Sequence, residues 1–343
     1  MRIIGFLSRW NASCGVSLHA ELIGKEFLRL GYRIKVFAPT LLSAGKWWHH
    51  KIVRKDESFV KRCYDELTPN LTGGAIDEDA ILSEDFDYFI VESYSSLPYR
   101  QVEELIPKIK RKANVVTVIH EGSREDIKFS SLSIFDKVII FDVRYKKVIG
   151  RIKNFEVIPY PCHPVVEGKR RFAEDKVRFF TFGRQPQHEY RSYIKALDTL
   201  SRKYDLTYHV VRSDGPLPFR RPWLHQETIR IDDVYPFLHN CDIHLLPKGK
   251  TDKIVVSSTL FLCLGSLTPI VAPNTRHFEF LPEIEGVKPA VIFADINDLE
   301  RKLVRLIEDE GFRESVKEAA RAYVEENRSD KVAKAFFSVL ESV

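Results

Sequence analysis

Apolar and polar positions along the chain follow a pattern that predicts short buried strands separated by amphipathic helices. Residues 2–7 form an apolar run, and apolar positions then recur with a helical period from Leu18 to Leu30. Gly31 stands where a helix end favours a residue with positive φ, and residues 32–37 return to a strand pattern. The chain is therefore expected to open with a strand–helix–strand unit.

The same plan recurs along the rest of the sequence. Further strands are expected at residues 88–92, 115–119, 137–141, 155–159, 179–182, 207–211, 228–231, 243–246, 270–272 and 290–293. Helices are expected at 190–202, 234–240, 259–264 and 298–309, with a long helical region from 312. Because strands and helices alternate, we predict parallel sheets with helices on both faces.

A break in this pattern divides the chain. Three prolines fall within residues 159–164, and the charged run 167–178 is typical of a linker. We expect an N-terminal Rossmann-like domain over 1–165, a C-terminal Rossmann-like domain over 166–325, and a terminal helix over 326–343 that packs back on the first domain. With 343 residues, two cores are expected. The predicted fold class is α/β, with two doubly wound domains facing a central cleft.

Composition narrows the function classes. No apolar run approaches the ~20 residues that span a bilayer, and the first residues lack a signal-peptide core, so a cytoplasmic location is expected. Five cysteines without C-x-x-C spacing argue against a zinc site or a disulfide framework. A net charge of +5 is too small to indicate nucleic acid binding without a motif.

One stretch is both basic and aromatic. Residues 44–55 carry four Lys or Arg residues and no acid, and include Trp47 and Trp48. Tryptophans beside lysines suit a headgroup interface, so peripheral contact with the anionic inner face of a membrane is one prediction. A solvated loop whose tryptophans pack on the domain is the alternative.

The stretch 177–200 is the strongest candidate for a ligand site. A buried strand ends at Gly183, and Arg184, His188 and Arg191 follow before the next helix. Loops at the carboxyl ends of parallel strands hold the ligand in open α/β sheets. A cationic loop there suits a diphosphate, although Arg184 could instead serve a surface ion pair.

Three other places carry candidate chemistry. Gly15 marks a loop before the first helix, where the backbone could approach a ligand or simply make a tight turn. His120 ends a strand, where it could hydrogen-bond a sugar hydroxyl or only local backbone, and Glu121 follows it. A predicted helix N-terminus carries Ser257, Ser258 and Thr259, which could bind phosphate or only cap the helix.

With these residues in view, the chain resembles the retaining glycosyltransferases of the GT-B fold, in particular the family 4 group. The first domain resembles the family in its glycine loop, helix and second strand (14–39) and in VVTVIHE, where His120 falls at the family's active-site histidine. IPYPCHP resembles the IPNG element. In the second half, FGR at 182–184 resembles the family's GR…K, whose cations hold the donor diphosphate; the lysine is missing, and Arg191 or His188 is the nearest cation.

The later segment 242–279 departs from the family's donor-binding pattern. Matching PIVA to the family's PVVA puts Leu262 at the glutamate that binds ribose and Leu267 at a usual glycine, whereas alignment on Gly265 puts Leu260 at that glutamate. Asp252 is a weak substitute for the first glutamate. Neither register restores the acid. Either other residues, for example Ser257, Ser258 or Thr259, bind the ribose, or the donor is atypical.

The resemblance implies transfer of a sugar from a nucleoside diphosphate sugar to a glycan, lipid-linked or small acceptor, without a cofactor or metal. The implied catalytic residues are His120 and Arg184. Donor-binding residues would be Gly15, Gly183, Arg184, His188, Arg191, Ser257, Ser258 and Thr259, and acceptor-binding residues Cys14, Ser17, Glu121 and His163. Rival hypotheses are a degenerate protein that binds a sugar nucleotide or glycan without turnover and a nucleotide-sugar epimerase.

Overall fold

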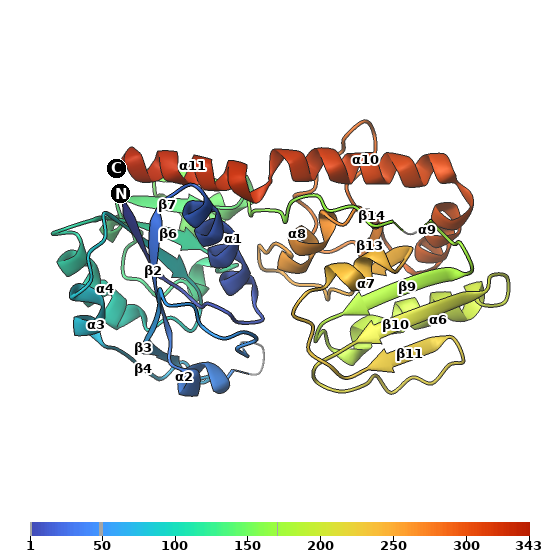
Figure 1. The fold of residues 1–343 in the computed structure, drawn as a ribbon, viewed down its shortest axis with the longest axis horizontal. Coiled ribbons are helices and arrows are strands. Elements are labelled where there is room, and N and C mark those ends of the chain that lie inside the picture. Colours follow the sequence, from blue (N-terminus) through green and yellow to red (C-terminus); the bar gives the residue numbers. More distant parts are fainter. Residues whose placement is uncertain (1, 48–50, 170) are drawn as a thin grey trace. The chain divides into compact units, whose positions relative to one another are not determined.

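The computed structural model describes residues 2–47, 51–169 and 171–343 (Figure 1). They form two compact units. Unit 1 contains the residues up to Pro161 together with Lys253–Ser258 and Asn327–Val343, and unit 2 contains Cys162–Asp252 and Thr259–Glu326. The chain thus returns twice to unit 1 after leaving it.

Unit 1 is built on an eight-stranded sheet with the order β4-β3-β2-β1-β5-β6-β7-β8. Its strands are β1 (Ile3–Leu7), β2 (Arg33–Pro39), β3 (Val60–Leu67), β4 (Gly73–Ile76), β5 (Tyr88–Ser93), β6 (Asn114–Ile119), β7 (Lys137–Ile140) and β8 (Phe155–Val157). The pairs are parallel except for β3–β4 at the edge. The central strand β5 is buried along its whole length, as expected for a sheet covered on both faces.

The helices of unit 1 include one from the far end of the chain. They are α1 (Gly15–Arg29), α2 (Leu41–Gly45), α3 (Glu78–Leu82), α4 (Tyr99–Ile109), α5 (Lys146–Ile149) and α11 (Ser329–Glu341), with 3-10 turns at Arg124–Asp126, Leu132–Ile134 and Val143–Tyr145. Helix α11 packs along α1, and the two chain ends lie together in Figure 1. An ion pair of 2.7 Å between Arg2 and Glu341 joins them.

Unit 2 has a six-stranded parallel sheet with the order β11-β10-β9-β12-β13-β14. The strands are β9 (Val177–Phe182), β10 (Leu206–Val211), β11 (Leu224–Glu227), β12 (Ile243–Leu245), β13 (Ile270–Pro273) and β14 (Val291–Phe293). The helices are α6 (Arg191–Leu200), α7 (Tyr235–His239), α8 (Ser258–Leu264), α9 (Ile296–Glu308) and α10 (Glu310–Glu326), with a 3-10 turn, η4, at Gln187–Tyr190.

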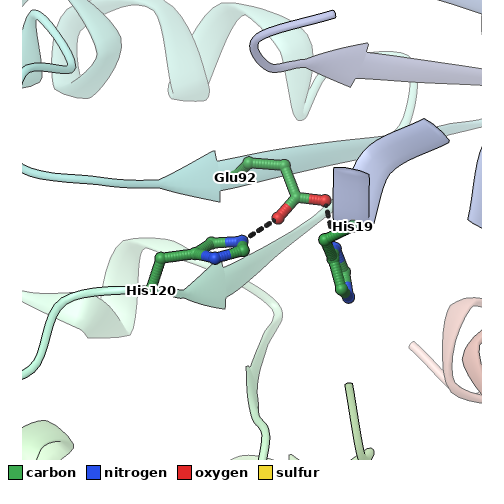
Figure 2. Close-up of side chains that lie close together, drawn as sticks. All are labelled: His19, Glu92 and His120. Carbon is green, nitrogen blue, oxygen red and sulfur yellow. Dashed lines mark hydrogen bonds and ion pairs between the residues drawn. The ribbon is translucent and has the colours of Figure 1, made fainter. Parts of the chain in front are cut away.

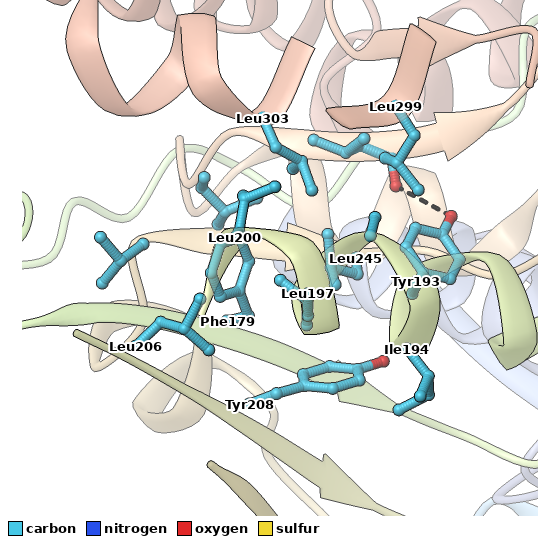
Figure 3. Close-up of a cluster of buried hydrophobic side chains, with 14 of the residues drawn as sticks. Phe179, Tyr193, Ile194, Leu197, Leu200, Leu206, Tyr208, Leu245, Leu299 and Leu303 are labelled. Atoms are coloured by element: carbon cyan, nitrogen blue, oxygen red, sulfur yellow. Dashed lines mark hydrogen bonds between the residues drawn. The ribbon is translucent and has the colours of Figure 1, made fainter. Parts of the chain in front are cut away.

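Helices α6 and α9 cover one face of this second sheet, and their apolar side chains form its core (Figure 3). Leu197 of α6 and Leu303 of α9 are fully buried. Phe179 of the central strand β9 is buried in the same cluster. Each such side chain contributes roughly 1.5–3 kcal/mol by leaving water. The apolar positions that recur with a helical period in the sequence are therefore the positions that α6 and α9 bury in this core.

The α/β fold class is confirmed, and most strands lie where the apolar runs predicted them. The strand expected at residues 228–231 is wrong: the edge strand β11 lies earlier, at Leu224–Glu227. Strands β3 and β4 were not predicted. These are edge or near-edge strands that mix polar with apolar residues, so they lack the continuous apolar run of a buried strand.

Within the described ranges, no helix combines the length and the apolar character needed to cross a bilayer.

Candidate functional site

Unit 1 gathers polar residues where three neighbouring parallel strands end. Strand β5 ends in Glu92 and Ser93, and β6 is followed directly by His120 and Glu121. The register pairs Glu92 with Val118 and Ser93 with Ile119, which brings these side chains to one edge of the sheet. Helix α1, which begins after β1, contributes His19 to this edge.

A carboxylate lies between two imidazoles at this edge (Figure 2). Oε2 of Glu92 lies 2.5 Å from Nε2 of His120, and Oε1 lies 2.8 Å from Nδ1 of His19. The Glu92 side chain is fully buried and that of His19 is 1% exposed, whereas that of His120 is 10% exposed. The three residues therefore run from the interior of the unit to its accessible edge.

The protonation of this group follows from its burial and its neighbours. Burial by itself raises the pKa of Glu92, but His19 and His120 outweigh it and lower that pKa to about 2. Burial lowers the pKa of His120 despite the opposing effect of Glu92. At neutral pH the group is thus an ionised carboxylate with a neutral His120.

The same three side chains form the one cluster among the described residues with three atoms of the types that bind metals. Two imidazoles and a carboxylate match donors that zinc accepts. Here, however, each carboxylate oxygen is in hydrogen-bond contact with one imidazole nitrogen. We therefore describe the group as a hydrogen-bonded triad.

Glu121 forms a second buried carboxyl group beside the triad. Its Oε1 accepts hydrogen bonds from the hydroxyls of Ser93, at 2.5 Å, and Tyr99. Its Oε2 is buried and has no partner among the described residues. Burial raises the pKa of Glu121 to about 7, so the proton of this carboxyl is exchanged near neutral pH.

Buried hydrogen bonds within unit 1 fix the loop before α1. Ser17 is fully buried; its hydroxyl accepts from the Ala12 amide at 2.9 Å and donates to Glu21 at 2.8 Å. The hydroxyl predicted to contact an acceptor is therefore used to fix the loop. Cys14 is the N-cap residue of α1, and its sulfur lies 3.9 Å from the Arg9 guanidinium.

A neighbouring segment of the same unit leaves little room for a side chain at Gly15. A Cβ atom at this position would lie 3.2 Å from the Cβ and Oγ of Ser258. Its carbonyl accepts a 2.6 Å hydrogen bond from Tyr160. The close approach predicted for Gly15 is thus made, in this structure, with protein atoms.

Segment Lys253–Ser258 lies on the loop that follows His120 and Glu121. The Ile254 amide donates to the Gly122 carbonyl at 2.8 Å, and Lys253 pairs with Asp126 at 2.7 Å. A Cβ at Gly122 would lie 2.7 Å from the Ile254 carbonyl, so glycine is required there. This contact was not visible in the sequence, because nearly 130 residues separate the partners.

Of the three hydroxyl residues predicted to bind phosphate, Ser257 is buried and Ser258 is part-buried, both in unit 1, whereas Thr259 belongs to unit 2. Helix α8 has only seven residues, so we base no phosphate site on its N-terminus.

In unit 2, cationic residues follow the ends of the central strands. Gly183, which has a φ of 120°, turns the chain after β9, and the part-buried Arg184 follows. Arg212, after β10, is buried and donates to the Gln185 carbonyl at 2.7 Å. It therefore fixes the backbone of the loop that carries Arg184.

Lys248, after β12, is a further cation at this edge of the second sheet. Burial lowers the pKa of its ammonium group, partly offset by Glu189. Within the described ranges the ammonium group makes no hydrogen bond or ion pair. A Cβ on Gly249 would lie 2.5 Å from Oε1 of Glu189, which places the Lys248–Gly249 turn against η4.

The other predicted residues of this half lie at different places. His188 is exposed on η4, and Arg191 is the exposed first residue of α6. His163 is part-buried in unit 2, where its ring is tilted by 39° against that of Tyr235 at a centroid distance of 4.3 Å. Its Nδ1 contacts the Pro164 carbonyl at 2.9 Å. His163 thus belongs to the other unit from Glu121 and His120.

No family model matches the sequence. Solved structures match over the full length at low identity. HepE from Anabaena, in complex with UDP-glucose, has a TM-score of 0.68 at 13% identity, with 100% of both chains covered. Sucrose-phosphate synthase from Thermosynechococcus elongatus has a TM-score of 0.68 at 12% identity, covering 100% of this chain and 99% of that one. TarM has a TM-score of 0.66 at 10% identity, with 99% of each chain covered.

The chain has the GT-B fold. Both sheets, and not one domain alone, take part in this match, because it extends over nearly all of the residues.

The backbone conformation of the second half bears on the two registers left open there. Leu267 has a φ of 58°, a conformation that favours glycine. The register that puts Leu267 at the usual glycine, and Leu262 at the ribose-binding glutamate, therefore fits the backbone. Gly265 has another role, because a Cβ there would lie 2.5 Å from the carbonyls of His163 and Pro164.

Three residues of the site were missed in the sequence: His19, Glu92 and Lys248. Glu92 had a usable signal, since it is an acid at the end of an otherwise apolar strand. His19 had none, because a histidine on the buried face of a helix reads as part of the core. Lys248 is one of several basic residues in its loop, and only the register of β12 against β9 shows that it lies at the same sheet edge as Arg184.

Proposed function

We propose that this protein is a glycosyltransferase that moves a sugar from a nucleoside diphosphate sugar to a glycan, lipid-linked or small-molecule acceptor. The observation that carries the proposal is the full-length GT-B match to chains that include a UDP-glucose complex. The candidate groups in both units lie at the carboxyl ends of parallel strands, where α/β sheets hold their ligands.

Unit 2 is proposed to bind the donor. Arg184 and Lys248 follow adjacent strands. Arg184 offers a forked guanidinium, and Lys248 offers an ammonium group that has no acceptor among the described residues. Both charges would oppose the negative charge that grows on the diphosphate as the glycosidic bond breaks, the kind of stabilisation worth about 3–4 kcal/mol per well-placed donor. The family resemblance favours retention of configuration and independence from metal ions, which are part of the proposal.

Unit 1 is proposed to bind the acceptor and the sugar. His120 supplies a neutral imidazole at the accessible edge, and Glu121 a carboxyl group that exchanges its proton near pH 7. A carboxylate oxygen without a partner suits a sugar hydroxyl, which donates a hydrogen bond.

Ligand-dependent stabilisation tests the proposal. Thermal unfolding is measured with UDP, GDP, ADP and their sugars, with EDTA present, and any hit is followed by a transfer assay. A ligand at 100 times its Kd stabilises by about 2.7 kcal/mol, which is readily measured. The absence of a shift with every nucleotide overturns the proposal.

A degenerate protein that binds a sugar nucleotide without turnover is the second candidate. It is favoured by Leu262, which stands at the position of the ribose-binding glutamate in the register that Leu267 supports. Nucleotide binding that Arg184→Ala abolishes, together with no hydrolysis or transfer, would establish this candidate instead.

Peripheral contact with an anionic membrane at the cytoplasmic face is also part of the proposal. Leu41 and Leu42, at the start of α2, are 60% and 78% exposed, and the basic residues Lys46 and Lys51 follow. Trp47 is tied to the unit by a 3.0 Å hydrogen bond from its indole to the Leu67 carbonyl. Trp48 lies outside the described residues. Among the described residues of this region, the exposed large apolar side chains are therefore the two leucines.

A further inference from the structure

The buried carboxylate of Glu92 has no role in the function described so far, although it connects two histidines. It lies at the end of the fully buried strand β5, and both of its oxygens are in contact with imidazole nitrogens. Burying a charge is costly unless it is paired and hydrogen-bonded. Among the described residues, Glu92 meets this condition through His19 and His120.

The direction of each hydrogen bond follows from the charge. An ionised carboxylate has no proton to donate, so the imidazole nitrogen in each contact must carry the hydrogen. Nε2 of His120 is therefore a donor to Oε2, and Nδ1 of His19 is a donor to Oε1. In a neutral imidazole only one nitrogen carries a hydrogen, so Nδ1 of His120 keeps its lone pair.

That lone pair lies at the accessible edge of the ring. Nδ1 of His120 forms no hydrogen bond with a described residue, and it is not among the buried polar atoms that lack a partner. The ring is fixed by edge contacts with His19 and Phe141, at centroid distances of 5.3 and 5.0 Å. Its orientation is therefore set by both packing and the Glu92 hydrogen bond.

We propose that Glu92 is a positioning residue, which holds His120 as the Nε2–H tautomer so that Nδ1 accepts a hydrogen bond from a hydroxyl of the bound sugar. His19 has a different part: it supplies the second donor to the carboxylate and keeps it ionised inside the unit. The role of Nδ1 toward a sugar rests on the proposed function, whereas the tautomer does not.

Nitrogen-15 NMR of histidine-labelled full-length protein tests the tautomer at neutral pH, with the His120 signals assigned by their loss in His120→Asn. The expected result is the Nε2–H form in the wild type and a mixture of both forms in Glu92→Ala. His19→Asn is the matched control, because its carboxamide can still donate to Glu92 and the bond between Glu92 and His120 stays in place, so the tautomer should be kept.

Glu92→Gln provides a second variant of equal size if Glu92→Ala does not fold. A carboxamide offers one acceptor and one donor group, so it cannot accept from both imidazoles, and one ring must change its tautomer. An Nδ1–H form of His120 in the wild type, or a tautomer unchanged in both Glu92 variants, overturns the inference.

Kinetics then separate positioning from binding. For the donor identified by the nucleotide panel, Glu92→Gln should lower kcat by about 10- to 100-fold, by analogy with the loss of the hydrogen-bond partner of a metal-ligating histidine. UDP affinity should change by less than about twofold, and Glu92→Asp should recover part of kcat. A wild-type kcat in a Glu92 variant whose His120 tautomer has changed overturns the inference.

Two further results separate a failure of this inference from a failure of the proposed function. Stoichiometric Zn²⁺ binding that Glu92→Gln abolishes overturns the inference, because the carboxylate would then serve as a metal ligand. A wild-type protein that binds no nucleotide overturns the proposed function, while the NMR result continues to decide the tautomer.

Discussion

Thr181 donates a 2.6 Å hydrogen bond from its hydroxyl to the carbonyl of Leu245, and this contact joins the carboxyl ends of β9 and β12. Arg184 and Lys248 follow these two residues by three positions each, just after the strands end. The parallel register therefore brings two cations to the same edge of the sheet, although they are 64 residues apart in the sequence.

Removing either cation should weaken diphosphate binding. A hydrogen bond to a charged group contributes roughly 1.5–3 kcal/mol, so Arg184→Ala and Lys248→Met should each raise the Kd for UDP by about 10- to 100-fold. Calorimetric titration with UDP and with pyrophosphate measures both. Lys250→Met is the matched control, because Lys250 is exposed two residues away. Equal affinities for Lys248→Met and Lys250→Met would remove Lys248 from the donor site.

The raised pKa of Glu121 predicts a pH-dependent stability. Its pKa rises from 4.5 to about 7 on folding, so the folded protein holds this proton more tightly than the unfolded chain. The stabilisation is complete below pH 4.5 and is lost as the pH rises through about 7. Glu121→Gln cannot titrate, so the stability of the wild type relative to this variant should fall by up to about 3 kcal/mol between pH 4.5 and 7.5. Urea unfolding at both pH values measures the difference, and parallel pH profiles would contradict the assignment.

Gly265 should not tolerate a side chain. A Cβ would lie 2.5 Å from two backbone carbonyl oxygens, and backbone cannot move aside as a flexible side chain does. Gly265→Ala should lower the free energy of unfolding by about 1–3 kcal/mol, the usual cost of overpacking. Gly45→Ala is the control, since its Cβ would meet no atom within 4 Å. Equal melting temperatures for the two variants would refute this account of Gly265.

Membrane contact through α2 predicts a specific loss of vesicle binding. Leu41→Ser with Leu42→Ser should reduce sedimentation with phosphatidylglycerol vesicles by at least about 10-fold, because each leucine that leaves water contributes roughly 1.5–3 kcal/mol. Val143→Ser is the control, since Val143 is 63% exposed elsewhere in unit 1. Equal partitioning of the wild type into anionic and neutral vesicles would remove the electrostatic part of the proposal.

The sequence by itself determined the buried strands and the amphipathic helices. Strands such as β5 and β9 could be predicted because a buried strand is a short, nearly continuous apolar run. Helix α6 could be predicted because its buried residues recur with the helical period. Gly183 and Gly31 could also be predicted, since the positive φ of each is a local property of the turn. Arg184 followed from its place after such a strand.

Only the tertiary structure decided which distant residues meet. Glu92 becomes the partner of His19 and His120 through strand order and the packing of α1, and Lys248 joins Arg184 through the register of β12 against β9. Segment Lys253–Ser258 lies on the Gly122 loop through contacts between residues far apart in the chain. Such pairings depend on the alignment of whole strands, and a local pattern of apolar and polar residues carries no information about them.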